Sequence, residues 1–168
     1  MTIKPSLALG SWAAFQPMGD EAMVMGDLVL TNDEVNHVLS RLLASGFTIT
    51  ALHNHLLRSS PATMYMHIAG HGDPVKLAAA LRQALSASRT PLAAPQSPSA
   101  SAAASRLDLD VAALNRLMGG EGKTAGGILQ YSFPRAERLM DGDMETPPTM
   151  GTATAINFQP TGDGRAAI

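Results

Sequence analysis

Residues Ala51–Asp73, ALHNHLLRSSPATMYMHIAGHGD, decide how the N-terminal half of this chain folds. Two strand-like runs flank Arg58-Ser-Ser-Pro61, whose residue types are typical of a turn, so the stretch predicts a β-hairpin. It also contains four of the chain's five histidines. The hairpin therefore determines both the sheet and the position of these imidazoles.

The flanking sequence extends the hairpin into an α+β unit. Thr31 and Glu34 form a capping box before an apolar pattern of helical spacing, and Asp73 with Pro74 is typical of a second helix start. The expected elements are strands at 11–16 and 21–30, a helix between Thr31 and Gly46, strands at 47–56 and 63–69, and a helix from Pro74. This β-β-α-β-β-α order predicts an antiparallel sheet with both helices packed on one face, in the manner of ferredoxin-like units.

The C-terminal part is expected to be a partial second repeat. Residues 86–105 are mostly Ser, Ala and Pro, which predicts a disordered linker between a main unit at 1–85 and a block at 106–168. FQPMGD at 15–20 returns as FQPTGD at 158–163. The later strands, including one expected at 128–139, lack an obvious partner. They are expected to complete the N-terminal sheet, or to exchange with a second copy and form a homodimer.

Composition excludes several classes of function. The net charge of −2 and the absence of a basic block argue against a nucleic-acid partner. The chain has no cysteine, which excludes thiolate ligands and thiol catalysis. No apolar run predicts a membrane span or a signal peptide. The chain as given is therefore expected to be cytoplasmic, or exported if a leader has been trimmed from it.

Several motifs resemble a known family. The stretches ALGSWAAFQPMGDEAMVMGDLVLT, ITALHNHLL, MYMHIAGHGD and FPRAERL are similar to the LppY/LpqO-like family, named for mycobacterial lipoproteins. The resemblance covers nearly all of the chain outside the linker. It implies a shared fold and tandem units, and it implies no particular reaction. The chain departs from the family in showing no export signal and in ending before a second HNH segment.

The histidines of the hairpin suggest a metal site. His53 and His55 lie two residues apart and share one face of a strand. If the turn centres on Ser60, His53 lies opposite His67 and His55 lies opposite Tyr65, whereas a slip of one residue would disperse the cluster. Neutral imidazoles suit zinc or iron, and three protein ligands leave a coordination position open for water or substrate. The predicted ligands are His53, His55 and His67, with Glu34, Tyr65, His71 and Asp73 as additional candidates.

Two functional hypotheses remain open at this stage. In the first, the chain is a small histidine-rich domain that binds a metal or small-molecule ligand and extends to a metal-dependent enzyme of unspecified reaction. Without a metal, the histidines and Tyr65 would still suit acid and base chemistry. In the second, the chain is a non-catalytic structural or interaction module whose sheet face binds a partner or a second copy. No catalytic residue and no organic cofactor site is assigned, and His37 is expected to be a solvated helix residue.

Overall fold

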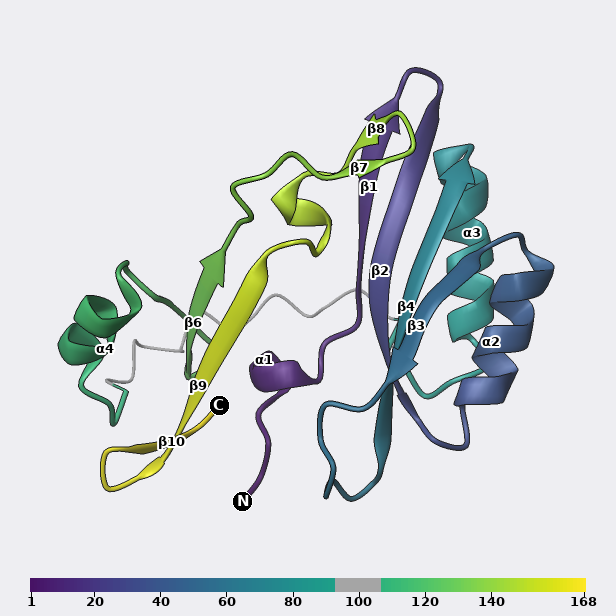
Figure 1. Ribbon diagram of the computed structural model, residues 1–168. Helices are drawn as coiled ribbons and strands as arrows, with labels where there is room; N and C mark the ends of the chain where they lie inside the picture. The colour runs from purple at the N-terminus through teal and green to yellow at the C-terminus, as the bar shows by residue number, and fades with distance from the viewer. Residues whose placement is uncertain (93–106) are drawn as a thin grey trace. The chain divides into compact units, whose positions relative to one another are not determined.

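The computed structural model describes residues 1–92 and 107–168 (Figure 1). Contacts divide the chain into two compact units. The unit Ser11–Ala94 contains all five histidines and is called the histidine unit. The other combines Met1–Gly10 with Pro95–Ile168 and is called the split unit. This division differs from the predicted blocks, because the first ten residues belong with the C-terminal part of the chain.

The histidine unit has the predicted β-β-α-β-β-α order. Its elements are β1 (Trp12–Met18), β2 (Glu21–Thr31), α2 (Val35–Ala44), β3 (Thr48–His53), β4 (Thr63–Gly72) and α3 (Pro74–Leu85). The strands form an antiparallel sheet in the order β1-β2-β4-β3. Both helices lie on one face of this sheet, as predicted (Figure 1).

Burial of alternate strand residues explains this arrangement. Val24, Leu28 and Leu30 of β2 share one face and pack with Met66 and Ile68 of β4. The helices contribute Val35, Val38, Leu42, Leu77, Leu81 and Leu85 to the same cluster. Burying one such side chain contributes about 1.5–3 kcal/mol. The residues between them in sequence are thereby turned to the opposite face of the sheet.

The split unit has a sheet of its own. Its elements are α1 (Pro5–Ala8), α4 (Val111–Met118), β5 (Lys123–Ala125), β6 (Ile128–Phe133), β7 (Met140–Asp141), β8 (Met144–Glu145), η1 (Pro148–Met150), β9 (Thr154–Gly162) and β10 (Arg165–Ala167). Four strands pair in the order β10-β9-β6-β5, and β7 pairs with β8. Leu114 and Met118 of α4 pack against Leu129, Tyr131 and Phe158 on one face of the four-stranded sheet.

The C-terminal strands do not add to the N-terminal sheet, in contrast to the first of the two alternatives expected from sequence, whereas exchange with a second copy stays a prediction. β6 pairs with β9 on one side and with β5 on the other, and β5 was not predicted. The strand expected at 128–139 ends at Phe133, because Pro134 follows and cannot donate to a ladder. The two FQPxGD motifs occupy matching places, at the ends of β1 and β9 and in the hairpin turns that follow. None of the described helices is long and apolar enough to cross a membrane.

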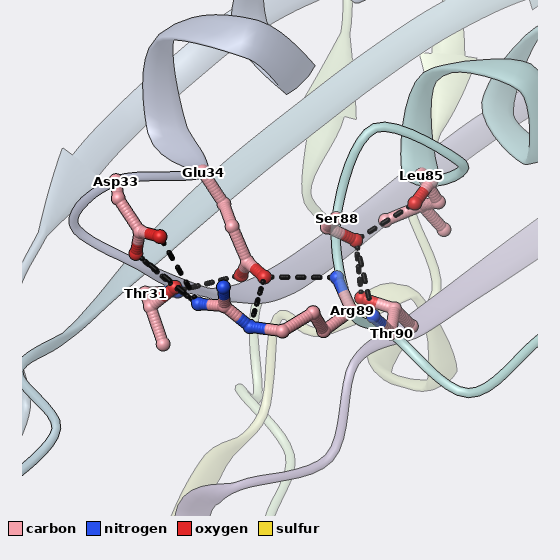
Figure 2. A network of polar contacts seen from close by, with 7 residues as sticks. All are labelled: Thr31, Asp33, Glu34, Leu85, Ser88, Arg89 and Thr90. Carbon is pink, nitrogen blue, oxygen red and sulfur yellow. Dashed lines mark hydrogen bonds and ion pairs between the residues drawn. The ribbon is translucent and has the colours of Figure 1, made fainter.

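A polar network joins the start of α2 to the residues that follow α3 (Figure 2). Glu34 accepts hydrogen bonds from the Thr31 amide at 2.9 Å and from the Arg89 amide at 2.8 Å. The Arg89 guanidinium lies 3.2 Å from Glu34 and 3.1 Å from Asp33. The first part of the predicted linker, residues 86–92, is thus held in place by specific contacts. The rest of that predicted linker, 93–105, lies outside the described residues.

Glu34 is buried, with 7% of its surface exposed, and its ionised form is stabilised by this network. Burial alone raises the pKa of Glu34, but hydrogen bonds from Arg89 and Thr31 and the charge of Arg89 outweigh it. The pKa is therefore held below its ordinary value of 4.5. Since the folded-state pKa is depressed, this stabilisation is present above pH 4.5 and is lost as the pH falls through the folded-state pKa.

Replacing Glu34 tests this network. Glu34→Gln should lower the free energy of unfolding by about 1–3 kcal/mol, because a buried N–H loses its acceptor. It should also flatten the acid-induced loss of stability below pH 4.5, measured by urea denaturation at several pH values. Asp33→Asn is the matched control, since Asp33 is exposed, and it should cost under about 1 kcal/mol. Equal effects of the two substitutions would contradict this account.

Gly26 sets the close approach of β1 to β2. A Cβ atom at Gly26 would lie 2.6 Å from the Trp12 carbonyl oxygen, which is backbone and cannot swing away. Gly26→Ala should therefore destabilise the protein by about 1–3 kcal/mol and shift the fluorescence of Trp12, the only tryptophan. Gly120→Ala is the control, because its Cβ would meet no atom within 4 Å. An unchanged unfolding midpoint for Gly26→Ala would show that β1 does not run this close.

Candidate functional site

The candidate site lies on the sheet face of the histidine unit that is opposite to α2 and α3. Met66 and Ile68 of β4 point toward the helices, so Tyr65 and His67 point to the other face. Residues paired across antiparallel strands share a face. Asp27 of β2 pairs with His67, and His53 of β3 pairs with Tyr65, which gathers all four on the face away from the helices.

Of the two registers that the sequence leaves open, the one with the turn centred on Ser60 differs from the observed pairing by two residues but places the side chains on the observed face. Ala51 lies opposite His67, and His53 lies opposite Tyr65. A shift of two residues preserves the side-chain face, whereas a shift of one would have reversed it. β3 ends at His53 and not at 56, and an irregularity between Ile49 and Ala51 changes the register. His55 therefore lies in the connection beyond the strand.

The shortest contact in the site joins two imidazoles. His53 Nε2 lies 2.9 Å from His67 Nε2. Asp27 Oδ2 lies 3.7 Å from the same atom of His67, and the Asp27 side chain is 15% exposed against 42% for His67. Asp27 Oδ1 is buried and has no hydrogen-bond partner among the described residues. The two imidazole nitrogens thus lie at hydrogen-bond distance from each other, with the Asp27 carboxylate near that of His67, and the carboxylate retains unused acceptor capacity.

A second pair of rings forms one side of this site. His55 stacks on Tyr65 with ring centroids 3.9 Å apart and planes 8° apart, and it lies 4.7 Å from the ring of His53. Partial burial, and then the neighbouring His53, lower the pKa of His55 below its ordinary value. Burial raises the pKa of Tyr65 above its ordinary value. His55 is thereby favoured as a neutral ring and Tyr65 as a neutral phenol.

The other predicted ligands lie elsewhere. Glu34 is bound to Arg89 and Thr31 at the start of α2, on the helix side of the sheet. Asp73 caps α3 by accepting from the amides of Val75 and Lys76. His71 is on the same face as His67 but pairs with Glu21 at 3.4 Å. Within residues 1–92 and 107–168, no group of three His, Asp or Glu side chains is arranged ready to hold a metal ion. His37 is exposed on α2, as expected.

Asp27 is the site residue that sequence reasoning missed. The strand EAMVMGDLVLT is otherwise apolar, and Asp27 is its only carboxylate apart from Glu21 at the first position. A charged residue inside a strand, away from any turn or helix start, has no local backbone amide to cap. That position was the signal that could have identified it. Pairing it with the histidines required the order β2-β4-β3, which the sequence did not provide.

Comparison with known proteins shows the family and corrects the resemblance drawn from sequence. The family model described as Domain of Unknown Function (DUF1259) matches residues 1–87 and 112–168. No curated protein and no solved structure gives a significant match. The assignment to the LppY/LpqO-like family is wrong, because the family model that covers most of the chain is DUF1259. The chain therefore belongs to the DUF1259 family, a domain of unknown function.

Proposed function

We propose that the histidine unit binds a divalent transition-metal ion between His53 and His67, with Asp27 as the third protein ligand. The observation that carries this proposal is the 2.9 Å separation of the two Nε2 atoms. Zinc and iron are the ions that suit two imidazoles and a carboxylate.

The distances support a shared ion after a small movement of Asp27. Two nitrogens bound to one ion at about 2.05 Å, with an angle of about 90–109° between the bonds, lie about 2.9–3.4 Å apart. The His53–His67 separation falls in this range. Asp27 Oδ2, at 3.7 Å from His67 Nε2, is less than about 1 Å too far to complete the set. Because of this distance, the three groups do not form a finished site as they stand. A rotation of the Asp27 side chain would bring its carboxylate closer.

The proposed ligand set differs from the one predicted from sequence in one member. His55 is replaced by Asp27, because the His55 ring stacks flat on Tyr65. His55 and Tyr65 would then form a wall beside the ion and limit the approach of water. Two histidines and one carboxylate leave coordination positions open for water or a small molecule, which is the arrangement that metal-dependent catalysis requires.

We also infer that the histidine unit is a rearranged ferredoxin-like fold. Moving β1 from the start of the unit to its end converts β-β-α-β-β-α into β-α-β-β-α-β, the ferredoxin-like order. The antiparallel sheet with two helices on one face supports this inference. The face left uncovered by helices in such a unit is the one that carries Asp27 and His67.

Metal titration tests the proposal. Purified protein stripped with chelator should bind one equivalent of Zn²⁺ or Fe²⁺, and an excess of 100 times the dissociation constant should stabilise it by about 2.7 kcal/mol. His53→Ala, His67→Ala and Asp27→Asn should each weaken binding at least about ten-fold, or about 1.4 kcal/mol. Calorimetry and the shift in melting temperature measure these effects.

His37→Ala and His71→Ala are the matched controls, since both histidines lie outside the proposed ligand set. They should leave the affinity unchanged. Failure of the wild-type protein to bind either ion would overturn the proposal. So would equal loss of affinity in the control variants, which would indicate binding to surface histidines in general.

The interaction-module hypothesis has one observation in its favour. Trp12 pairs with Asp27 across β1 and β2, lies on the same face, and is 40% exposed. Exposed tryptophan is enriched where proteins associate. If His53→Ala and Trp12→Ala weaken self-association in sedimentation experiments, and no metal binds, the face is an interaction surface.

A further inference from the structure

The strand β1 of the histidine unit has a free edge toward which part of its backbone points. β1 pairs on one side with β2, and no other described strand pairs with it. The Val29 amide donates to Ser11 Oγ at 2.9 Å, so the amide of Asp27, two residues earlier in β2, also points toward β1. Asp27 pairs with Trp12, which therefore directs its backbone N–H and C=O toward β2. The N–H and C=O of the next residue, Ala13, point to the free edge.

The internal repeat shows that the corresponding edge is paired in the split unit. The FQPxGD motifs align β1 with β9, so that residues 11–15 correspond to 154–158. β9 lies between β10 and β6, and β10 takes the place beside β9 that β2 takes beside β1. β6 pairs with β9 along 154–158 and ends its pairing before Pro160, which has no N–H to donate. The equivalent of the free edge thus accepts a strand, over the same stretch that precedes Pro17 in β1.

The free edge of β1 has no charged side chain to keep other strands away. Its sequence, WAAFQPM, contains neither acidic nor basic residues, whereas natural edge strands are commonly protected by charges such as lysine. Trp12 and Phe15 remain 40% and 39% exposed. Pro17 limits pairing only near the end of the strand. Residues 11–15 therefore form an uncharged, partly apolar edge that suits a further strand.

These five residues are complementary to a second copy of themselves. When two β1 strands run antiparallel about a two-fold axis at Ala13, that residue pairs with its own counterpart, and Ser11 pairs with Phe15 of the other copy. Trp12 then lies opposite Ala14, on the face away from the helices. Each aromatic side chain meets a small one, and no like charges face each other. All the outward backbone groups in 11–15 find partners.

Other registers of the same pair are less favourable. An axis at Ala14 would pair Ser11 with Pro17, which cannot donate a hydrogen bond. It would also place Trp12 opposite Gln16 and not opposite a small residue. The complementarity therefore selects the axis at Ala13.

We propose that β1 pairs edge to edge with β1 of a second copy, antiparallel and centred on Ala13, to form a two-fold symmetric homodimer with one continuous sheet. The second copy takes the place beside β1 that β6 takes beside β9. Strand addition of this kind gains affinity from main-chain hydrogen bonds and specificity from the alternating side chains. The dimer does not depend on metal binding, because it uses the backbone edge of β1, which contains none of the proposed ligands.

Disulfide formation at the two-fold axis tests the dimer, since the chain has no native cysteine. In the proposed pair, the two copies of residue 13 lie opposite each other with Cα atoms about 5.5 Å apart. This spacing is within the range of about 4.4–6.8 Å that a disulfide spans. Ala13→Cys alone should therefore give a covalent dimer on mild oxidation. Ala78→Cys, at an exposed alanine of α3, is the matched control and should stay monomeric.

A neighbouring cysteine tests the register. Residue 14 of each copy should lie opposite Trp12 and not opposite its own counterpart, so Ala14→Cys should link more slowly than Ala13→Cys. Faster linking at residue 14 would contradict the axis at Ala13. Equal linking of Ala13→Cys and Ala78→Cys would show that the copies meet only by random collision, and the proposed dimer would be excluded.

A second measurement needs no cysteine. The unmodified protein should have a mass above the 17.5 kDa of one chain in sedimentation equilibrium, and dilution should lower it. Ala13→Lys should raise the dissociation constant of the dimer at least about ten-fold, because two like charges would lie directly opposite each other. Ala78→Lys adds the same charge on α3 and should leave the constant unchanged.

Circular dichroism should show that the lysine variants are folded, since both alanines are exposed. A monomeric mass of the unmodified protein at all concentrations would overturn the proposal. A dimer that Ala13→Lys leaves intact would overturn it as well, because the copies would then associate through another surface.

Discussion

The alternation of side chains along β4 is the constraint on which the rest of the histidine unit depends. Met66 and Ile68 must be buried beneath α2 and α3, because these contacts form the centre of the main core. Once they are buried, Tyr65 and His67 are directed to the other face. The hydrophobic core therefore determines the sheet face on which the His67 imidazole lies. The gathering of Asp27, Tyr65 and His67 on this face is a consequence of how the unit folds.

This constraint explains why one of the two registers left open by the sequence places the histidines on the observed face although its pairing differs by two residues. The elements were predictable because capping residues and apolar periodicity are local signals, and Thr31, Glu34, Asp73 and Pro74 marked both helix starts. The register between β3 and β4 was not predictable, because it depends on the connection at 54–62 and on an irregularity in β3. The error of two residues left the face intact, so the cluster of His53 with His67 survived.

The carboxylates show a clearer limit of sequence reasoning. Glu34 and Asp73 are the carboxylates that the sequence analysis offers as additional metal ligands. Both lie at helix starts, where backbone amides are available, and the structure uses both there. Asp27 lies in the middle of a strand, has no such amide, and retains a buried oxygen without a partner among the described residues. A carboxylate that local structure does not use is the better candidate for a ligand.

The two FQPxGD hairpins have corresponding faces in the two units, one toward the helices and one away from them. Phe15 pairs with Val24, on the helix side of its sheet, and Phe158 packs with α4, on the helix side of its own. Gln16 and Gln159 follow these phenylalanines and so lie on the opposite faces. In the split unit that face binds the backbone of the N-terminal segment through Gln159. In the histidine unit it carries Asp27 and His67. The corresponding face thus carries polar side chains in both units, carboxamides in the split unit and imidazoles with a carboxylate in the histidine unit, while the opposite face packs against helices.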